Sequence, residues 1–185
     1  FLHREADVIT INGIDKGYIL DEKTAAEKRK ISREKILSVL ETLSGTKVSD
    51  DAFLIINSGR YEFKNKGIDL FINALGKLNR DGNLDKEVVA VIAVPANISG
   101  IYKELEYRLE GKKSVEGHTE LPCTHHIFGY EYDAVLNSLR ENSLQNNEND
   151  KVKVIFVPSY LNGNDGVFNI NYNDFLYAFD LSVFP

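Results

Sequence analysis

Two short, almost entirely apolar segments, residues 88–94 and 152–157, constrain the fold of this chain more than any other feature. Each is followed directly by a proline, Pro95 or Pro158, which ends a strand because it has no N–H to donate. A continuous apolar run of this length indicates a strand covered on both faces, as in a parallel sheet flanked by helices. Residues 53–56 form a third segment of this kind.

Helical patterns separate these strands. The expected helices lie at about 25–43, 67–78, 102–109, 132–144 and 171–179, and further strands are expected at 6–11 and 181–184. Residues 97–121 are polar and less regular. Strands that alternate with helices are typical of an open parallel sheet with right-handed crossovers, so the sequence predicts an α/β fold.

Composition narrows the class of protein. The 185 residues are enough for one domain, and 22 basic against 28 acidic residues give a net charge of −6. A mildly acidic chain is a poor candidate for nucleic-acid binding, which needs a basic surface. No apolar run approaches the roughly 20 residues that span a bilayer, so we expect no membrane partner.

The single cysteine, Cys123, excludes an internal disulfide framework and a cysteine-based zinc cluster. It fits a reducing compartment, and we expect a cytoplasmic protein. The chain contains no methionine, begins at Phe1 and ends at Pro185 directly after an apolar run. We therefore expect it to be an excised piece of a longer protein.

The most informative loop is residues 57–67, which follows a buried strand and opens a helix. In an open α/β sheet, ligands bind beyond the carboxyl ends of the strands. Gly59 and Gly67 allow the backbone to approach a ligand closely. The cations of the loop are Arg60, Lys64 and Lys66. Together with the free N–H groups expected at the helix N-terminus, they suit a diphosphate. An equally good interpretation is that these three cations are surface charges of an ordinary βα loop.

This loop matches neither a Walker motif nor a dinucleotide-binding fingerprint, which disfavours nucleoside triphosphatases and dinucleotide enzymes. Glu62 serves either as a carboxylate of the site or as a partner that organises Arg60 or Lys64. After the strand at 152–157, Tyr160 and Leu161 either wall a pocket for a base or sugar or are plain loop residues.

Other candidates are weaker. His125 and His126 are adjacent, and neighbours in sequence rarely chelate one ion, so histidines that hydrogen-bond locally are the better interpretation. Ser58 has no recognisable partner histidine, so no nucleophilic triad is predicted. We expect no metal site and no cofactor.

Several ordered motifs resemble one known family. Residues 59–69, Gly-Arg-Tyr-Glu-Phe-Lys-Asn-Lys-Gly-Ile-Asp, resemble a string in the eukaryotic-type glycogen synthases. Residues 88–96, 123–125, 150–156 and 172–185 are similar to later segments of that family, in the same order. The resemblance covers about residues 50–185 and is looser over 1–49.

The resemblance implies the GT-B architecture, in which two Rossmann-like domains enclose the active site, and this chain would be part of the C-terminal one. It implies a retaining transfer of glucose from UDP-glucose to an α-1,4-glucan such as glycogen. By position, Arg60 and Lys66 would be the catalytic cations that contact the donor diphosphate, beside Gly59. Tyr160 is a weaker donor-binding candidate. The resemblance further implies that no metal takes part, so protein cations would neutralise the departing UDP.

The sequence also departs from the family pattern. The long helical insertion before Thr124-His125 is compressed to about residues 97–121, and His126 replaces an asparagine. A glutamate pair expected beyond Pro185 is absent, so we expect the isolated chain to be inactive. A GT-B half without its final strands and helices leaves a sheet edge and an apolar face uncovered, so we also expect self-association, as a possible homo-oligomer. The alternatives that stay open are a non-catalytic nucleotide-sugar or glucan-binding module and a different GT-B glycosyltransferase.

Overall fold

A computed structural model describes residues 13, 15–112 and 122–184. The strands are β1 (Phe53–Ser58), β2 (Val88–Ala93), β3 (Ile98–Ile101), β4 (His125–Ile127), β5 (Val152–Val157) and β6 (Leu181–Val183). The α-helices are α1 (Glu22–Ser44), α2 (Ile68–Asp81), α3 (Lys103–Leu109), α4 (Ala134–Glu141) and α5 (Tyr172–Leu176). Two short 3-10 helices, η1 and η2, span Lys16–Tyr18 and Tyr130–Tyr132.

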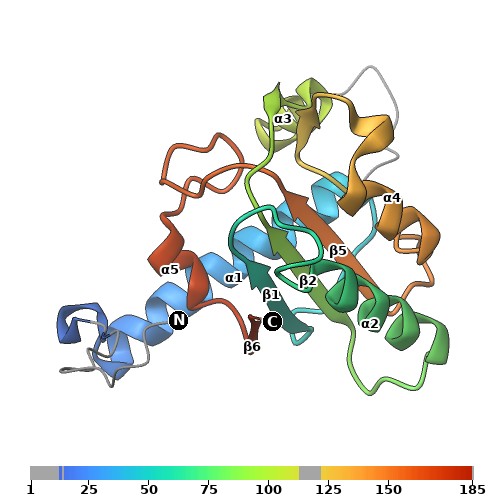
Figure 1. The fold of residues 1–185 in the computed structure, drawn as a ribbon. Coiled ribbons are helices and arrows are strands. Elements are labelled where there is room, and N and C mark those ends of the chain that lie inside the picture. The colour runs from blue at the N-terminus through green and yellow to red at the C-terminus, as the bar shows by residue number, and fades with distance from the viewer. Residues whose placement is uncertain (1–12, 14, 113–121, 185) are drawn as a thin grey trace, which may run out of the picture.

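The main sheet has four parallel strands in the order β5-β2-β1-β6 (Figure 1). The chain steps outward from β1 to β2 and β5, and then returns to place β6 on the other side of β1. This is a Rossmann-like order, and the direction of winding reverses between β1 and β6. The predicted α/β fold with an open parallel sheet and flanking helices is confirmed.

The two faces of the sheet carry separate hydrophobic cores. One core joins alternate strand residues such as Leu54 and Val91 to α1 and α5. The other joins their neighbours, such as Ile55 and Ile92, to α2 and α4. Every residue of β2 and β5 is buried, because side chains of a strand alternate between two faces that are both covered. The all-apolar runs are explained by these two layers.

The helix expected at 132–144 is shorter than predicted. Asp133 interrupts it, and its carboxylate accepts the Leu136 N–H at 2.9 Å as the N-cap of α4. A second sheet, in which β3 pairs with β4 in antiparallel register, lies within and beyond the region read as irregular. The strand expected at 6–11 lies outside the described residues.

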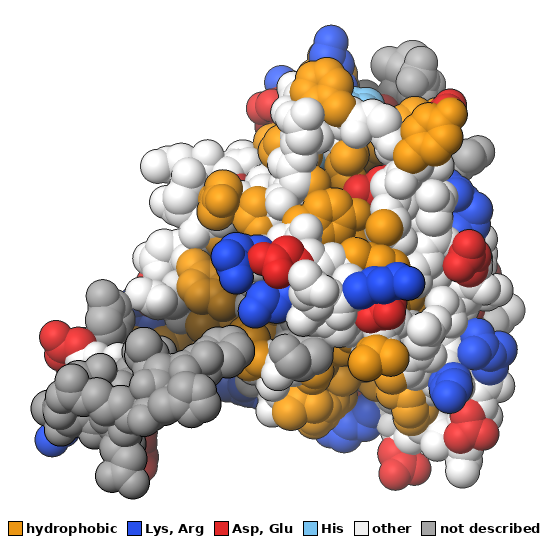
Figure 2. All heavy atoms as spheres, in the orientation of Figure 1, with side chains coloured by type: hydrophobic (Ala, Val, Ile, Leu, Met, Phe, Trp, Pro, Cys, Tyr) orange, Lys and Arg blue, Asp and Glu red, His pale blue; other side chains and the backbone are white. Residues whose placement is uncertain are grey.

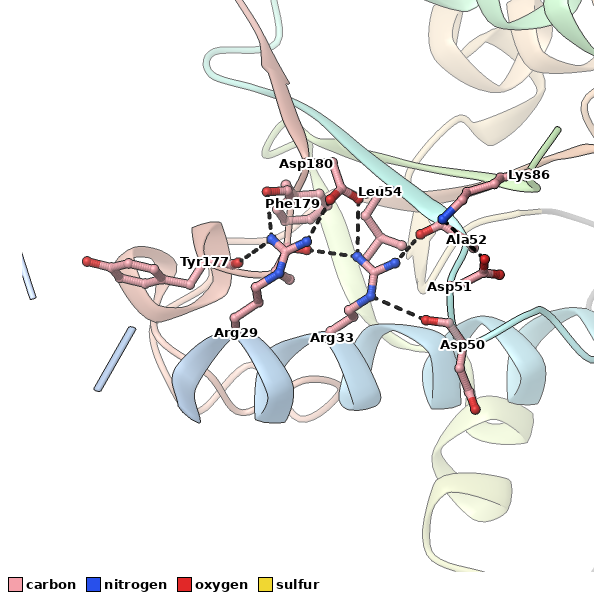
Figure 3. A network of polar contacts seen from close by, with 11 residues as sticks. Arg29, Arg33, Asp50, Asp51, Ala52, Leu54, Lys86, Tyr177, Phe179 and Asp180 are labelled. Atoms are coloured by element: carbon pink, nitrogen blue, oxygen red, sulfur yellow. Dashed lines mark hydrogen bonds and ion pairs between the residues drawn. The ribbon is translucent and has the colours of Figure 1, made fainter. Parts of the chain in front are cut away.

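A network of charged groups ties α1 to the turn before β6 (Figure 3). The Asp180 carboxylate accepts from Arg29 at 2.6 Å, from Arg33 at 3.2 Å and from the Leu54 N–H at 2.8 Å. Arg29 also donates to the carbonyls of Tyr177 and Phe179. The network therefore holds α1, β1 and the approach to β6 together.

Gly76 is a buried position of α2 that has no room for a methyl group. A Cβ there would lie 2.5 Å from Asn142 Oδ1 and 2.8 Å from Asn142 Cβ. We expect Gly76→Ala to lower the free energy of unfolding by about 1–2 kcal/mol, because overpacking outweighs the better helix propensity of alanine. Urea unfolding measures this loss. A second change, Asn142→Gly, should recover part of it, and an unchanged Gly76→Ala variant would contradict the packing described.

Candidate functional site

The carboxyl ends of β1, β2 and β5 border a cavity of about 640 Å³. The lining residues end or follow the three strands or begin α5: Ser58, Gly59, Arg60, Tyr61, Ala93, Pro95, Ser159, Tyr160, Leu161 and Tyr172. This is the edge at which open α/β sheets bind ligands. Three of the predicted site residues, Gly59, Arg60 and Tyr160, therefore line one cavity.

Arg60 is held loosely at the edge of this cavity. Its side chain is 78% exposed, and its Nε lies 3.0 Å from Glu62 Oε1. Of the two roles considered for Glu62, the structure thus shows the pairing with Arg60. An exposed ion pair of this kind contributes little to stability, so the guanidinium can exchange this partner for a ligand anion. Gly59 precedes it with a φ of +147°, a backbone conformation that favours glycine.

Lys66 lies at the end of the same loop but not in the cavity lining. It is half-buried in the turn before α2. The amides of Ile68 and Asp69 both donate to the Phe63 carbonyl, at 3.0 and 3.3 Å. The prediction that the start of α2 offers free N–H groups is therefore wrong for these two amides, because the tight turn already uses them.

Tyr61 fixes the loop between β1 and α2 through two hydrogen bonds of its hydroxyl. Its hydroxyl donates to Asp133 Oδ2 at 2.6 Å and accepts the Val135 N–H at 3.2 Å. Burial and the neighbouring carboxylate raise the pKa of Tyr61 well above its ordinary value, so the phenol stays neutral. The bond fastens the β1–α2 loop to the start of α4. Sequence reasoning missed this pair, because its members are 72 positions apart.

On the other side, two hydroxyls bridge β1 and α5. Ser58 Oγ lies 2.8 Å from the hydroxyl of Tyr172. Since β1 leads into the loop of Arg60 and α5 leads into β6, this bond lies across the point where the winding of the sheet reverses. The Tyr160 side chain is 76% exposed at the rim of the cavity, and Leu161 is buried.

The paired histidines have separate environments. Thr124 Oγ1 and His125 Nδ1 are 2.7 Å apart, and burial lowers the pKa of His125. The ring of His126 packs on Tyr102 with centroids 3.9 Å apart. Burial raises the pKa of Cys123 to about 12, so its thiol stays protonated. Within the described residues, no three potential ligands of His, Cys, Asp or Glu gather to hold a metal ion.

Figure 2 shows how charges are distributed over one face of the molecule. Basic and acidic side chains are interspersed there, with hydrophobic side chains between them. A phosphate ligand on this face would therefore depend on individual cations and not on a broad basic area. In the part of the chain that the structure describes, no helix has the length and apolarity that crossing a membrane requires.

Comparisons with known proteins agree on one family. Its model, described as glycogen synthase, matches residues 1–113 and 108–185. Glycogen (starch) synthase isoform 2 of Saccharomyces cerevisiae is 29% identical over 74% of this chain and 28% of its own length. Glycogen (starch) synthase of Caenorhabditis elegans is 27% identical over all of this chain and 36% of its own length. The liver glycogen (starch) synthase of Rattus norvegicus is 27% identical over 72% of this chain and 26% of its own length.

The chain thus spans about a third or less of these relatives. The alignment with the worm protein runs over 242 residues although this chain has only 185, so that relative carries residues that this chain lacks. The two matches of the family model overlap at residues 108–113. This overlap lies inside the segment 97–121, where the family's helical insertion is expected to be compressed. Because the two matches together cover the whole sequence, the chain belongs to the glycogen synthase family.

Proposed function

We propose that this chain is the donor-binding region of a retaining glucosyltransferase that moves glucose from UDP-glucose to an α-1,4-glucan. The observation that carries the proposal is the place of Arg60, at a cavity on the carboxyl edge of a Rossmann-like sheet, within a chain of the glycogen synthase family. The cavity volume of about 640 Å³ lies in the range of small-molecule sites. The proposal includes a cytoplasmic location.

In this proposal, Arg60 leaves Glu62 and donates two parallel N–H bonds to the donor diphosphate. Such a fork binds phosphate oxygens more strongly than a neutral donor does. Its positive charge stabilises the negative charge that develops on UDP as the bond to glucose breaks. Lys66, which the structure leaves outside the cavity lining, would add its charge from the end of the loop.

The hydrogen bonds of the Tyr61 hydroxyl with Asp133 and Val135, at the start of α4, support this role of the loop. Because these hydrogen bonds hold Tyr61 in place, Arg60 can change partners without unfolding the segment around it. Tyr160, exposed at the rim, is proposed to contact the nucleotide.

The choice of donor tests the proposal against other GT-B glycosyltransferases. With the protein that carries this chain, transfer of labelled glucose onto an α-1,4-glucan is expected from UDP-glucose in preference to ADP-glucose. Competition between the two donors at equal concentration measures the preference. Faster transfer from ADP-glucose would favour a different synthase, and donor binding without any transfer would favour a non-catalytic nucleotide-sugar-binding module.

A further inference from the structure

One buried hydroxyl in the wall of this cavity makes no hydrogen bond with the described residues. Ser159 lines the cavity directly after β5, and its Oγ is buried. Among the residues that the structure describes, this Oγ has no hydrogen-bond partner. A buried hydroxyl without a partner costs free energy, so native proteins rarely keep one without a use.

The other hydroxyls of the wall differ from it. Ser58 and Tyr172 already share a hydrogen bond of 2.8 Å. Among the described residues of this lining, Ser159 carries the one buried hydroxyl that has no hydrogen-bond partner. A serine side chain has three staggered rotamers, so a rotation about its Cα–Cβ bond can turn the hydroxyl toward a bound molecule.

The position of Ser159 indicates which part of a ligand it meets. It follows β5, whereas Arg60 follows β1, and β2 lies between these strands. With neighbouring strands about 4.8 Å apart, the two strand ends are separated by roughly 10 Å. A ligand whose phosphates lie at Arg60 therefore reaches Ser159 with an uncharged part.

The neighbour of Ser159 favours a nucleoside as this part. Tyr160 is 76% exposed and lines the same cavity, and an aromatic ring offers a stacking surface to a base. A serine hydroxyl both donates and accepts, so it can pair with the fixed polar groups of a base or ribose. We propose that Ser159 hydrogen-bonds the nucleoside of the donor and that its unpaired hydroxyl is a specificity-determining group. This inference rests on the proposed function.

The proposal predicts two opposite effects of Ser159→Ala. The variant should unfold about 2–4 °C above the wild-type chain, because it removes an unsatisfied buried hydroxyl. The same variant should raise the dissociation constants of UDP and of uridine by a common factor of about 3 to 10, because both ligands carry the nucleoside. Thermal unfolding without ligand and NMR titration with each ligand measure these effects on the 185-residue chain.

Two further variants make the result specific. Ser58→Ala removes a hydroxyl that is already paired, so it should not raise the unfolding temperature. Arg60→Ala should weaken the binding of UDP but leave that of uridine unchanged, because uridine has no phosphate.

Each alternative outcome has a distinct meaning. If UDP binding depends on Arg60 but not on Ser159, the assignment of the hydroxyl is overturned and the proposed function stands. If Ser159→Ala weakens the binding of UDP but not that of uridine, the hydroxyl meets the phosphates and the nucleoside assignment is wrong. If the wild-type chain binds neither UDP nor uridine, both proposals are overturned.

Discussion

Arg60→Ala is expected to lower kcat/KM for glucosyl transfer by about 100- to 1000-fold in the protein that carries this chain. This is the loss found when one preorganised donor to a developing negative charge is removed. The expected loss falls on activity and not on folding, because Arg60 is 78% exposed and its ion pair with Glu62 lies at the surface. Steady-state kinetics with UDP-glucose measure the effect.

Two other variants give this experiment its controls. Arg60→Lys keeps the charge but loses the planar fork, so its activity should lie between those of the alanine variant and the wild type. Arg80→Ala removes an exposed arginine from the last turn of α2, roughly 20 Å along the helix from the loop, and should leave transfer unchanged. Full activity of Arg60→Ala would show that another group neutralises the diphosphate.

The second large effect concerns stability. Asp180→Ala is expected to lower the free energy of unfolding by about 2–3 kcal/mol. The change removes the carboxylate that accepts hydrogen bonds from Arg29, Arg33 and the Leu54 amide in a partly buried network. The side chains of Arg33 and Asp180 are 16% and 23% exposed, so the expected loss is smaller than the roughly 3–5 kcal/mol that breaking a fully buried ion pair costs. Urea unfolding at pH 7 measures it.

A matched control lies in the same network (Figure 3). Asp51 pairs with Lys86 at 3.1 Å, but both side chains are more than half exposed, so Asp51→Ala should leave stability nearly unchanged. Equal losses from Asp51→Ala and Asp180→Ala would show that burial of the network contributes nothing.

The contribution of Asp180 should also depend on pH. Burial alone would raise the pKa of Asp180, but hydrogen bonds from the Leu54 amide, Arg29 and Arg33 outweigh it and hold the pKa below its usual value. A lowered folded pKa gives stability that is present above the unfolded value of about 3.9 and lost as the pH falls through the folded one. The stability difference between wild type and Asp180→Asn should therefore shrink as the pH falls from 7 to 3. A constant difference would contradict the assignment.

Features with a strong local pattern were predictable from the sequence. The strand at 152–157 has the predicted bounds, because an apolar run that ends at proline has few other solutions. The placement of Arg60 and Tyr160 at one cavity follows from the rule that binding loops leave the carboxyl ends of parallel strands.

Features that depend on distant partners were not predictable. β3 contains only two apolar residues in four and is stabilised by pairing with β4, more than twenty positions later in the chain. The bond of Arg33 to Asp180 joins residues 147 positions apart. The amides at the start of α2 looked free because nothing in the sequence shows that the preceding turn brings the Phe63 carbonyl to them.

Calorimetric titration of this chain with UDP tests the central claim most directly, because it isolates the proposed diphosphate site from catalysis. The proposal predicts one UDP bound per chain, a dissociation constant raised about 10- to 100-fold by Arg60→Ala, and wild-type affinity in Arg80→Ala. Absence of UDP binding, or binding that Arg60→Ala leaves unchanged, would contradict it.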